Sequence, residues 1–230
     1  MTKERLFTYR ITHDKGFAPN PFGGILTLAT CKPGMRRTKI EGDWVAGFAS
    51  KFLAKNTKIE TRREIHPDSL IYLMRVTEVL SLDKYFNDPR FQMKKPRSGG
   101  YKAQRGDNIY RLKDPDTYEG VGKSDHSNDG TYPQETIATD TGGENALISD
   151  EFYYLGRDCT LPKVGTKDEW PSELKLPYGP TCYGIRNDEN ALKILQEFIK
   201  DKGFKVKHAG IPCLQTEEPS SFSKCGGCSS

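Results

Sequence analysis

Residues 6–30, LFTYRITHDKGFAPNPFGGILTLAT, decide the expected fold, because two apolar runs flank a polar loop in this stretch. The first run, residues 6–11, alternates with a period of two, which is typical of a half-buried strand. The second run, residues 24–30, is more uniformly apolar and indicates a central strand. The loop between the runs holds a His-Asp pair and two prolines, and it is longer than the usual connection of about 2 to 6 residues. Polar chemistry on a loop held by rigid strands is typical of a functional site.

Strand signals continue outward from this stretch and dominate the first half of the chain. Two Gly-Asp turns, at residues 42–43 and 106–107, each lead into a predicted strand. Helix signals are fewer and depend on capping residues and on apolar periodicity. The sequence therefore predicts an α+β fold with a mixed, strand-rich sheet and flanking helices. The remaining predicted elements are a long strand over 69–80, a short helix over 81–86, a helix over 188–202 and a last strand over 204–206.

The chain of 230 residues is expected to form one domain, since domains commonly hold about 100 to 200 residues. We assign residues 1–214 to this domain and residues 215–230, rich in Ser, Gly and Cys, to a flexible tail. Residues 114–145 are acidic and aperiodic, which predicts a long surface loop inserted into the domain.

Composition favours a protein that works in the cytoplasm without membrane contact. No apolar run approaches the roughly 18 residues of a membrane span. The first residues lead directly into a strand, with no apolar segment of the signal-peptide type.

Six cysteines are present, and only Cys225 and Cys228 have a motif spacing. A structural zinc site needs about four ligands, and no second pair is evident. We therefore expect neither a metal nor an organic cofactor, and we interpret the other cysteines as reduced.

Charge is distributed unevenly along the chain. Residues 1–63 hold thirteen Lys/Arg against five acids, and residues 94–113 hold seven against one. Residues 114–151 hold ten acids against one Lys. This asymmetry favours polyanion contact by the basic segments, with DNA, RNA or a free nucleotide as the expected partner. Solvated faces of both signs are the alternative interpretation.

Three residues are candidates for catalysis. His13 and Asp14 follow the first strand, where an imidazole beside a carboxylate can act as a general base. Asp14 can instead close a turn onto Gly16, with His13 merely exposed. Cys31 lies near three basic residues, as a nucleophilic cysteine requires, or it is a small buried residue at a strand end.

A second set of residues is predicted to bind a nucleotide or a base. An aromatic ring on a proline-stiffened loop can stack on a base, and an Asn amide can read an adenine-type edge. Guanidinium groups match phosphate oxygens, and a basic loop with an interleaved aromatic can follow a phosphate backbone. Core positions and solvated faces are the alternatives for each residue. The predicted set is Phe17, Asn20, Arg36, Arg37, Trp44, Lys94, Lys95, Arg97, Tyr101 and Arg105.

Several sequence signals are negative. Asp125 and His126 lie in the acidic segment, where nothing in the sequence fixes their geometry for a metal. Phosphate-loop, dinucleotide, zinc-protease, hydrolase and zinc-deaminase motifs are absent, so those common enzyme classes are disfavoured.

Eight segments spread over most of the chain share one pattern, namely residues 13–22, 31–33, 36–37, 42–45, 72–78, 87–91, 106–110 and 152–156. In these segments the chain resembles the second of the nucleotide-modification-associated domain families. That family is inferred to act in bacterial and phage systems that make, read or handle modified bases. A fainter likeness is to PUA-like and EVE-type barrels, which hold a base in a pocket and imply a barrel as the alternative fold.

These observations predict a nucleic-acid or nucleotide-binding protein of a base-modification or phage-defence system. The alternative is an enzyme that acts on a base or nucleotide through His13, Asp14 or Cys31. A third possibility is a protein-interaction module whose acidic segment is the working surface.

Overall fold

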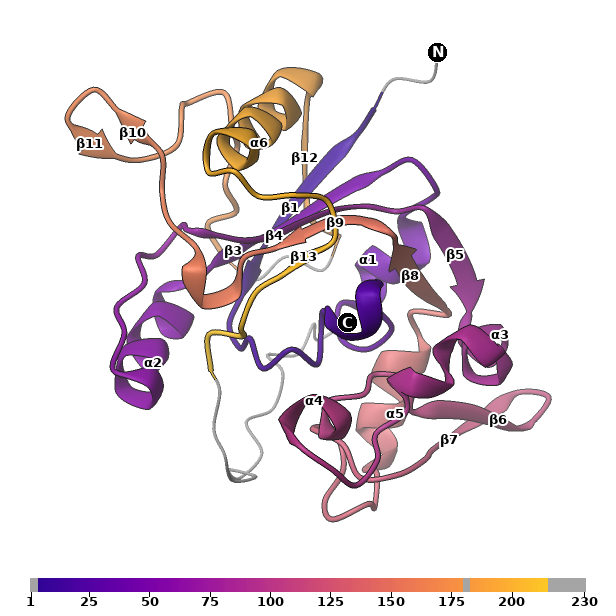
Figure 1. Ribbon diagram of the computed structural model, residues 1–230. Helices are drawn as coiled ribbons and strands as arrows, with labels where there is room; N and C mark the ends of the chain where they lie inside the picture. The colour runs from indigo at the N-terminus through magenta and orange to yellow at the C-terminus, as the bar shows by residue number, and fades with distance from the viewer. Residues whose placement is uncertain (1–3, 180–182, 215–230) are drawn as a thin grey trace.

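A computed structural model describes residues 4–179 and 183–214 of the chain (Figure 1). Its centre is a mixed sheet with the strand order β12-β1-β3-β4-β9-β13. The two innermost strands of the first half, β1 and β3, are parallel, and β4 and β9 continue the sheet in antiparallel pairs. The strands are β1 Leu6–Ile11, β3 Trp44–Ala49, β4 Leu70–Arg75, β9 Glu151–Tyr154, β12 Ile185–Asn187 and β13 His208–Ala209.

A second sheet has three strands in the order β2-β8-β5, all antiparallel. These are β2 Leu26–Leu28, β8 Asn145–Ser149 and β5 Glu78–Ser81. Two hairpins complete the strands: β6 Tyr110–Asp114 with β7 Thr117–Gly120, and β10 Lys163–Val164 with β11 Lys167–Asp168.

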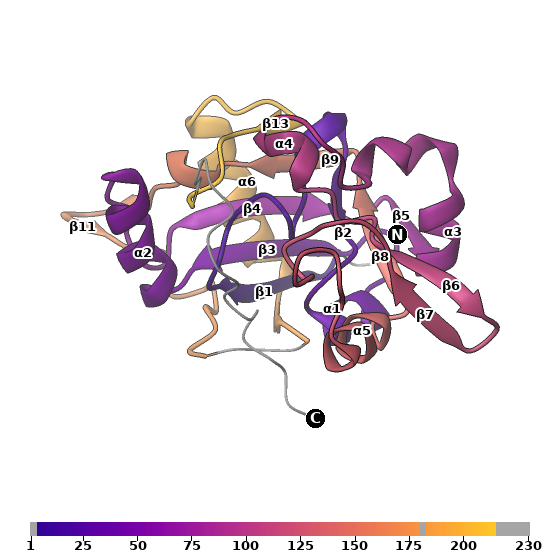
Figure 2. The ribbon, with the colours of Figure 1, turned by 90° about the horizontal axis from the view of Figure 1, so that it is seen from below.

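Helices cover the sheets and connect them. α6 Glu189–Asp201 packs its apolar residues into the main core, and Asp188 caps it by accepting the backbone N–H of Asn190 and Ala191. α2 Lys51–Thr61 lies at one end of the large sheet, and the β6–β7 hairpin lies at the other (Figure 2). The other α-helices are α1 Pro33–Thr38, α3 Leu82–Asn87, α4 Tyr101–Gln104 and α5 Gln134–Thr141, and the 3-10 helices are η1 Phe22–Gly24, η2 Pro89–Lys94 and η3 Gly156–Asp158.

The predicted α+β class is confirmed, and the strands form the mixed sheet that was predicted as the first of the two alternatives. Among the residues described, the strands form open sheets and no closed barrel, so the barrel alternative is wrong. The predicted strand over 69–80 is two strands, because the chain leaves the large sheet after Arg75 and joins the small sheet at Glu78. The strand predicted over 24–30 is shorter, and it lies at the edge of the small sheet. The last strand falls at 208–209 and not at 204–206.

Residues 114–145 are not one continuous loop as predicted, whereas their being an insertion in the domain stays a prediction. This segment contains β7 and α5, and Tyr132 and Ile137 are buried in a small hydrophobic core with Phe17 and Ile109. Apolar burial by a few anchors orders the segment although its composition is acidic.

Two further predictions concern the C-terminal tail and contact with a membrane. The predicted tail 215–230, with Cys225 and Cys228, lies outside the described residues. Within 4–179 and 183–214, none of the helices combines the length and the apolar character that a bilayer crossing requires.

Candidate active site

Cys31 sits in a constrained turn between β2 and α1. Its backbone has a φ of 56°, and Lys32 follows at 43°, both in the left-handed region that side chains with a Cβ rarely adopt. Hydrogen bonds on both sides hold this conformation. The N–H of Cys31 donates to Asp140 Oδ1 at 2.8 Å, and its carbonyl accepts from Arg36 Nε at 2.7 Å. The half-buried thiol is therefore presented by a fixed main chain.

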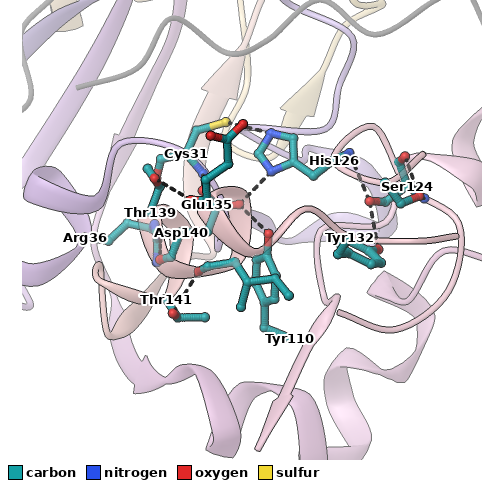
Figure 3. Close-up of polar contacts among 12 residues, drawn as sticks. Cys31, Arg36, Tyr110, Ser124, His126, Tyr132, Glu135, Thr139, Asp140 and Thr141 are labelled. Carbon is teal, nitrogen blue, oxygen red and sulfur yellow. Dashed lines mark hydrogen bonds and ion pairs between the residues drawn. The ribbon is translucent and has the colours of Figure 1, made fainter. Parts of the chain in front are cut away.

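His126 lies between the thiol and a carboxylate (Figure 3). Its Nε2 is 3.4 Å from Cys31 Sγ, and its Nδ1 is 2.6 Å from Asp140 Oδ2. The Phe17 ring packs against the imidazole in a T-shaped contact, with the ring centres 4.9 Å apart. The backbone N–H of His126 donates to Ser124 Oγ at 3.1 Å. Contacts with the ring and with the main chain thus fix the imidazole.

Asp140, in the last turn of α5, is the buried acceptor of the cluster. Its Oδ2 also accepts the Tyr110 hydroxyl at 2.7 Å. Burial by itself raises the pKa of this carboxyl, but the charge and hydrogen bond of His126, the charge of Arg36 and the Tyr110 bond outweigh it. The pKa of Asp140 consequently lies below its ordinary value, and the group is a carboxylate at neutral pH.

Arg36 is fully buried, and its guanidinium donates hydrogen bonds to main-chain carbonyls around the cluster. Besides the carbonyl of Cys31, it donates to the carbonyls of Asn145, at 2.8 Å, and of Asp140. Burial lowers the pKa of the guanidinium, although Asp140 opposes this shift. These contacts join α1, the end of α5 and the start of β8 around Cys31.

Glu135 brings a second carboxyl group to the cluster. It lies in the first turn of α5, and its side chain lies beside Cys31 and His126 (Figure 3). The side-chain ligand atoms of Cys31, His126 and Asp140 lie within 4.8 Å of one another. However, Cys31 and Asp140 contact opposite nitrogens of one imidazole, which is the arrangement of a thiol, a base and an orienting acid. A metal bound to Cys31 and to Nε2 would have Asp140 as the group that orients its histidine.

Of the predicted catalytic residues, the structure brings only Cys31 into this cluster. Asp14 is buried and accepts hydrogen bonds from the Tyr154 hydroxyl and from the backbone N–H of Cys213, at 3.0 Å. Burial raises the pKa of its carboxyl, although these hydrogen bonds oppose the rise. His13 is half-buried, and its ring packs on Phe52 with centres 5.1 Å apart. Catalytic roles for His13 and Asp14 stay predictions.

Several predicted nucleotide-binding residues form a buried internal network. Lys94 Nζ donates to the Asn20 carbonyl at 3.0 Å, to Asn20 Oδ1 at 2.8 Å and to the Ile25 carbonyl at 2.6 Å. The Asn20 amide donates to the carbonyl of Arg105 at 2.5 Å. Asp107 lies in the same region and accepts from Thr27 and Tyr85. The network joins the polar loop after β1 to the second Gly-Asp turn.

The other predicted binding residues are spread between core and surface. Phe17 and Trp44 are buried, and Trp44 Nε1 donates to Glu4 at 3.0 Å. Arg37 and Arg97 are exposed, whereas Lys95 and Tyr101 are half-buried. Nucleotide contact by these residues stays a prediction.

His126, Asp140 and Glu135 were not predicted as site residues, and the expectation that nothing fixes the geometry of His126 was wrong. His126 is 95 positions from Cys31 and Asp140 is 109. At that separation no local spacing connects them. The available signal was a lone His with nearby acids in a segment that resembled a solvated loop.

The fold and this cluster define an α+β protein with a partly buried thiol–imidazole–carboxylate site, built from the β2–α1 turn, the β7–α5 connection and α5. The family model of nucleotide modification associated domain 2 matches residues 3–213. The chain therefore belongs to that family, and the resemblance predicted from its motifs is confirmed. Searches of curated proteins and of solved structures return no match.

Proposed function

We propose that the protein is an enzyme of bacterial or phage nucleotide-modification systems that acts on a nucleotide or base through Cys31 as a covalent nucleophile. The observation that carries the proposal is the sequence of contacts from Cys31 Sγ to His126 Nε2 and from His126 Nδ1 to Asp140. A nucleophile, a base and a group that orients the base are the three parts of nucleophilic catalysis. The family supplies the nucleotide context.

Each residue has a defined role in the proposed reaction. His126 Nε2 accepts the thiol proton of Cys31, and the thiolate attacks an electrophilic carbon of the substrate. Asp140 holds the Nδ1 proton and stabilises the imidazolium. The imidazolium then returns its proton to the leaving group, and a second nucleophile releases the product from Cys31.

Alkylation of the thiol in the absence of substrate tests the first step. At pH 6 ordinary thiols are almost fully protonated, since their pKa is about 8.5. We expect iodoacetamide to label Cys31 faster at that pH than it labels the free thiol of N-acetylcysteine. Mass spectrometry assigns the labelled residue. Buried Cys159 and Cys213 are internal controls. Labelling of Cys31 no faster than N-acetylcysteine, and unchanged in His126→Gln, would contradict the proposal.

Turnover is the second readout. Nucleoside monophosphates and short oligonucleotides with plain and modified bases are incubated with the protein, and mass changes are followed. We expect Cys31→Ser and His126→Gln to lower any product formation by about a hundredfold or more, the usual contribution of a general base. Product that persists in Cys31→Ser would overturn the role of the thiol.

The exposed face of α2 supports a second candidate function, binding of a nucleic-acid strand. Lys51, Lys55 and Lys58 are exposed there, and Phe52 is 52% exposed. Ammonium groups beside an exposed aromatic ring suit a phosphate backbone and a stacked base. Lys58 also pairs with Glu64, so the first two lysines are the better test.

Fluorescence-anisotropy titrations across a salt series measure this binding. We expect the double variant Lys51→Ala/Lys55→Ala to bind single-stranded DNA of any sequence more weakly. The slope of the logarithm of the binding constant against the logarithm of the salt concentration should fall in magnitude by about two. The exposed pair Lys163→Ala/Lys167→Ala, on the β10–β11 hairpin, is the matched control. Equal losses in both double variants would show a general charge effect and would reject α2 as the binding surface.

A further inference from the structure

Arg105 is a buried and rigidly held guanidinium beside the candidate active site. The residue follows α4 and is 7% exposed. Its Nη1 forms an ion pair with Asp125, the residue before His126. The guanidinium carbon lies 4.8 Å from the centre of the Tyr101 ring, and Asn20 binds the main-chain carbonyl. Asp125 and Tyr101 therefore hold the side chain, and Asn20 holds the main chain of the same residue.

One donor of this guanidinium, the Nε N–H, is not used within the protein. The Nε atom is buried and has no hydrogen-bond partner. A buried donor without a partner is unfavourable, so such groups are rare unless a ligand, ion or water completes them. Nε–H and one Nη2 N–H form the parallel fork that fits two oxygens of a phosphate or carboxylate. Asp125 contacts Nη1, which lies outside that fork.

Asp125 has a complementary feature. Its Oδ2 is also buried without a partner, while its Oδ1 takes the ion pair. A ligand that satisfies both residues must accept hydrogen bonds at Arg105 and donate one at Asp125. A nucleotide combines these groups, because its phosphate accepts and its sugar hydroxyls or base N–H groups donate.

We infer that Arg105 binds a phosphate group of the substrate and that Asp125 both orients Arg105 and accepts a hydrogen bond from the same molecule. This inference rests on the proposed function, because it names the substrate class of that site as a phosphate-bearing nucleotide. Asp125 is adjacent in the chain to His126, so the phosphate would anchor the substrate close to the imidazole. Arg suits this role better than Lys because its fork is planar and always charged.

Binding is measured in Cys31→Ser protein, in which the proposed chemistry is disabled. The probes are inorganic phosphate, a nucleoside monophosphate, the corresponding nucleoside and a short single-stranded oligonucleotide, each titrated by calorimetry. We expect the monophosphate to bind at least about tenfold more tightly than the nucleoside, and Arg105→Gln to abolish that difference. Arg105→Lys should restore only part of it. Arg111→Gln, at an exposed residue paired with Glu119, is the matched control and should change nothing.

The two phosphate sources give different results. Tighter binding of the monophosphate than of the oligonucleotide would identify a free nucleotide, and the reverse order would identify a phosphate of a polymer. An unchanged monophosphate affinity in Arg105→Gln, or equal affinities of nucleoside and monophosphate, would overturn the inference.

A second measurement keeps the test valid if Arg105→Gln does not fold. Phenylglyoxal modifies arginines, and the extent at Arg105 is read by mass spectrometry in Cys31→Ser protein. We expect the monophosphate to protect Arg105 and to leave Arg111 unprotected. Equal modification with and without the monophosphate would overturn the inference. Alkylation of Cys31 in ligand-free wild-type protein is independent of both measurements, so the proposed function can fail or hold separately.

Discussion

Asp140 binds Cys31 through the main chain, since its Oδ1 accepts the Cys31 N–H at 2.8 Å. The other oxygen of the same carboxylate contacts His126 at 2.6 Å. Asp140, a buried acid at the end of α5, therefore fixes both the backbone conformation of Cys31 and the orientation of the His126 imidazole. The helix that carries Asp140 belongs to the acidic segment, so this segment is part of the candidate active site.

Asp140→Asn tests this double role. The amide oxygen can keep the bond to the Cys31 N–H, but the negative charge opposite His126 is lost. We expect the rate of Cys31 alkylation at pH 6 to fall at least about tenfold and the free energy of unfolding to fall by about 1 to 3 kcal/mol. Iodoacetamide labelling and urea unfolding measure the two effects.

The pH dependence of the Asp140→Asn effect follows from the pKa of the acid. The pKa of Asp140 is lowered in the folded protein, so its contribution to stability is present above the ordinary carboxyl pKa. That contribution is lost as the pH falls through the folded pKa, and the stability gap to Asp140→Asn should close in acid. Asp129→Asn, at an exposed acid paired with Lys123, is the control and should leave the stability nearly unchanged over the same pH range. A gap that stays constant down to pH 3 would contradict this account.

Arg36 and Arg37 are adjacent residues with opposite environments. Arg36 is buried with donors on three carbonyls, whereas exposed Arg37 makes one contact of 3.2 Å to the Gly142 carbonyl. Lysine cannot reproduce the planar fork of Arg36. We expect Arg36→Lys to lower the free energy of unfolding by about 2 kcal/mol or more, because buried carbonyls lose their donors. Arg37→Lys should leave it within about 0.5 kcal/mol, and equal effects of the two variants would refute the difference.

The parts of the fold that were predictable carry local signals. Alternation over residues 6–11 predicted β1, and the caps Ser81 and Asp188 marked the starts of α3 and α6. α2 was not predicted, because its exposed face carries Phe52 and Ile59 among lysines and blurs the apolar stripe. Ser50, which caps α2 by accepting the Leu53 N–H at 3.0 Å, was the signal that was available.

The candidate site was predictable only in part, because its members meet through tertiary structure. Cys31 was a candidate on local grounds, since three basic residues follow it closely in the sequence. His126 and Asp140 reach it only after the hairpin and α5 pack against Phe17. Arg36 and Lys94 were predicted from the sequence to bind phosphate. In the structure both side chains instead donate hydrogen bonds to main-chain carbonyls inside the protein.

Tyr154→Phe tests how Asp14 holds the loop after β1. The Tyr154 hydroxyl donates to the buried Asp14 carboxyl, which also accepts the N–H of Cys213. Without the hydroxyl, Asp14 loses one donor in a desolvated place. We expect the free energy of unfolding to fall by about 1 to 3 kcal/mol in urea unfolding at pH 7. Tyr178→Phe, at a fully exposed tyrosine, is the control, and an equal effect there would remove the role assigned to the Asp14 contact.

Lys94→Met tests the buried lysine that joins the loop after β1 to the second Gly-Asp turn. Its ammonium contacts three oxygens, and Met leaves those acceptors without a donor. We expect a loss of about 1 to 3 kcal/mol in the free energy of unfolding at pH 7. Exposed Lys113→Met, in the β6–β7 hairpin, is the matched control and should stay within about 0.5 kcal/mol.

The stability difference between wild type and Lys94→Met should also depend on pH. Burial lowers the pKa of Lys94 from 10.5 to about 8, while the charge of Asp107 opposes the shift. The unfolded chain therefore holds more protons than the folded protein between those two values, and wild-type stability gains with rising pH in that window. Comparison with Lys94→Met cancels the titration of the tyrosines. We expect the advantage of the wild type to grow by about 1 kcal/mol or more from pH 7.5 to pH 9.5. An advantage that shrinks over this range would mean that the ammonium form is favoured by its three acceptors over the neutral amine.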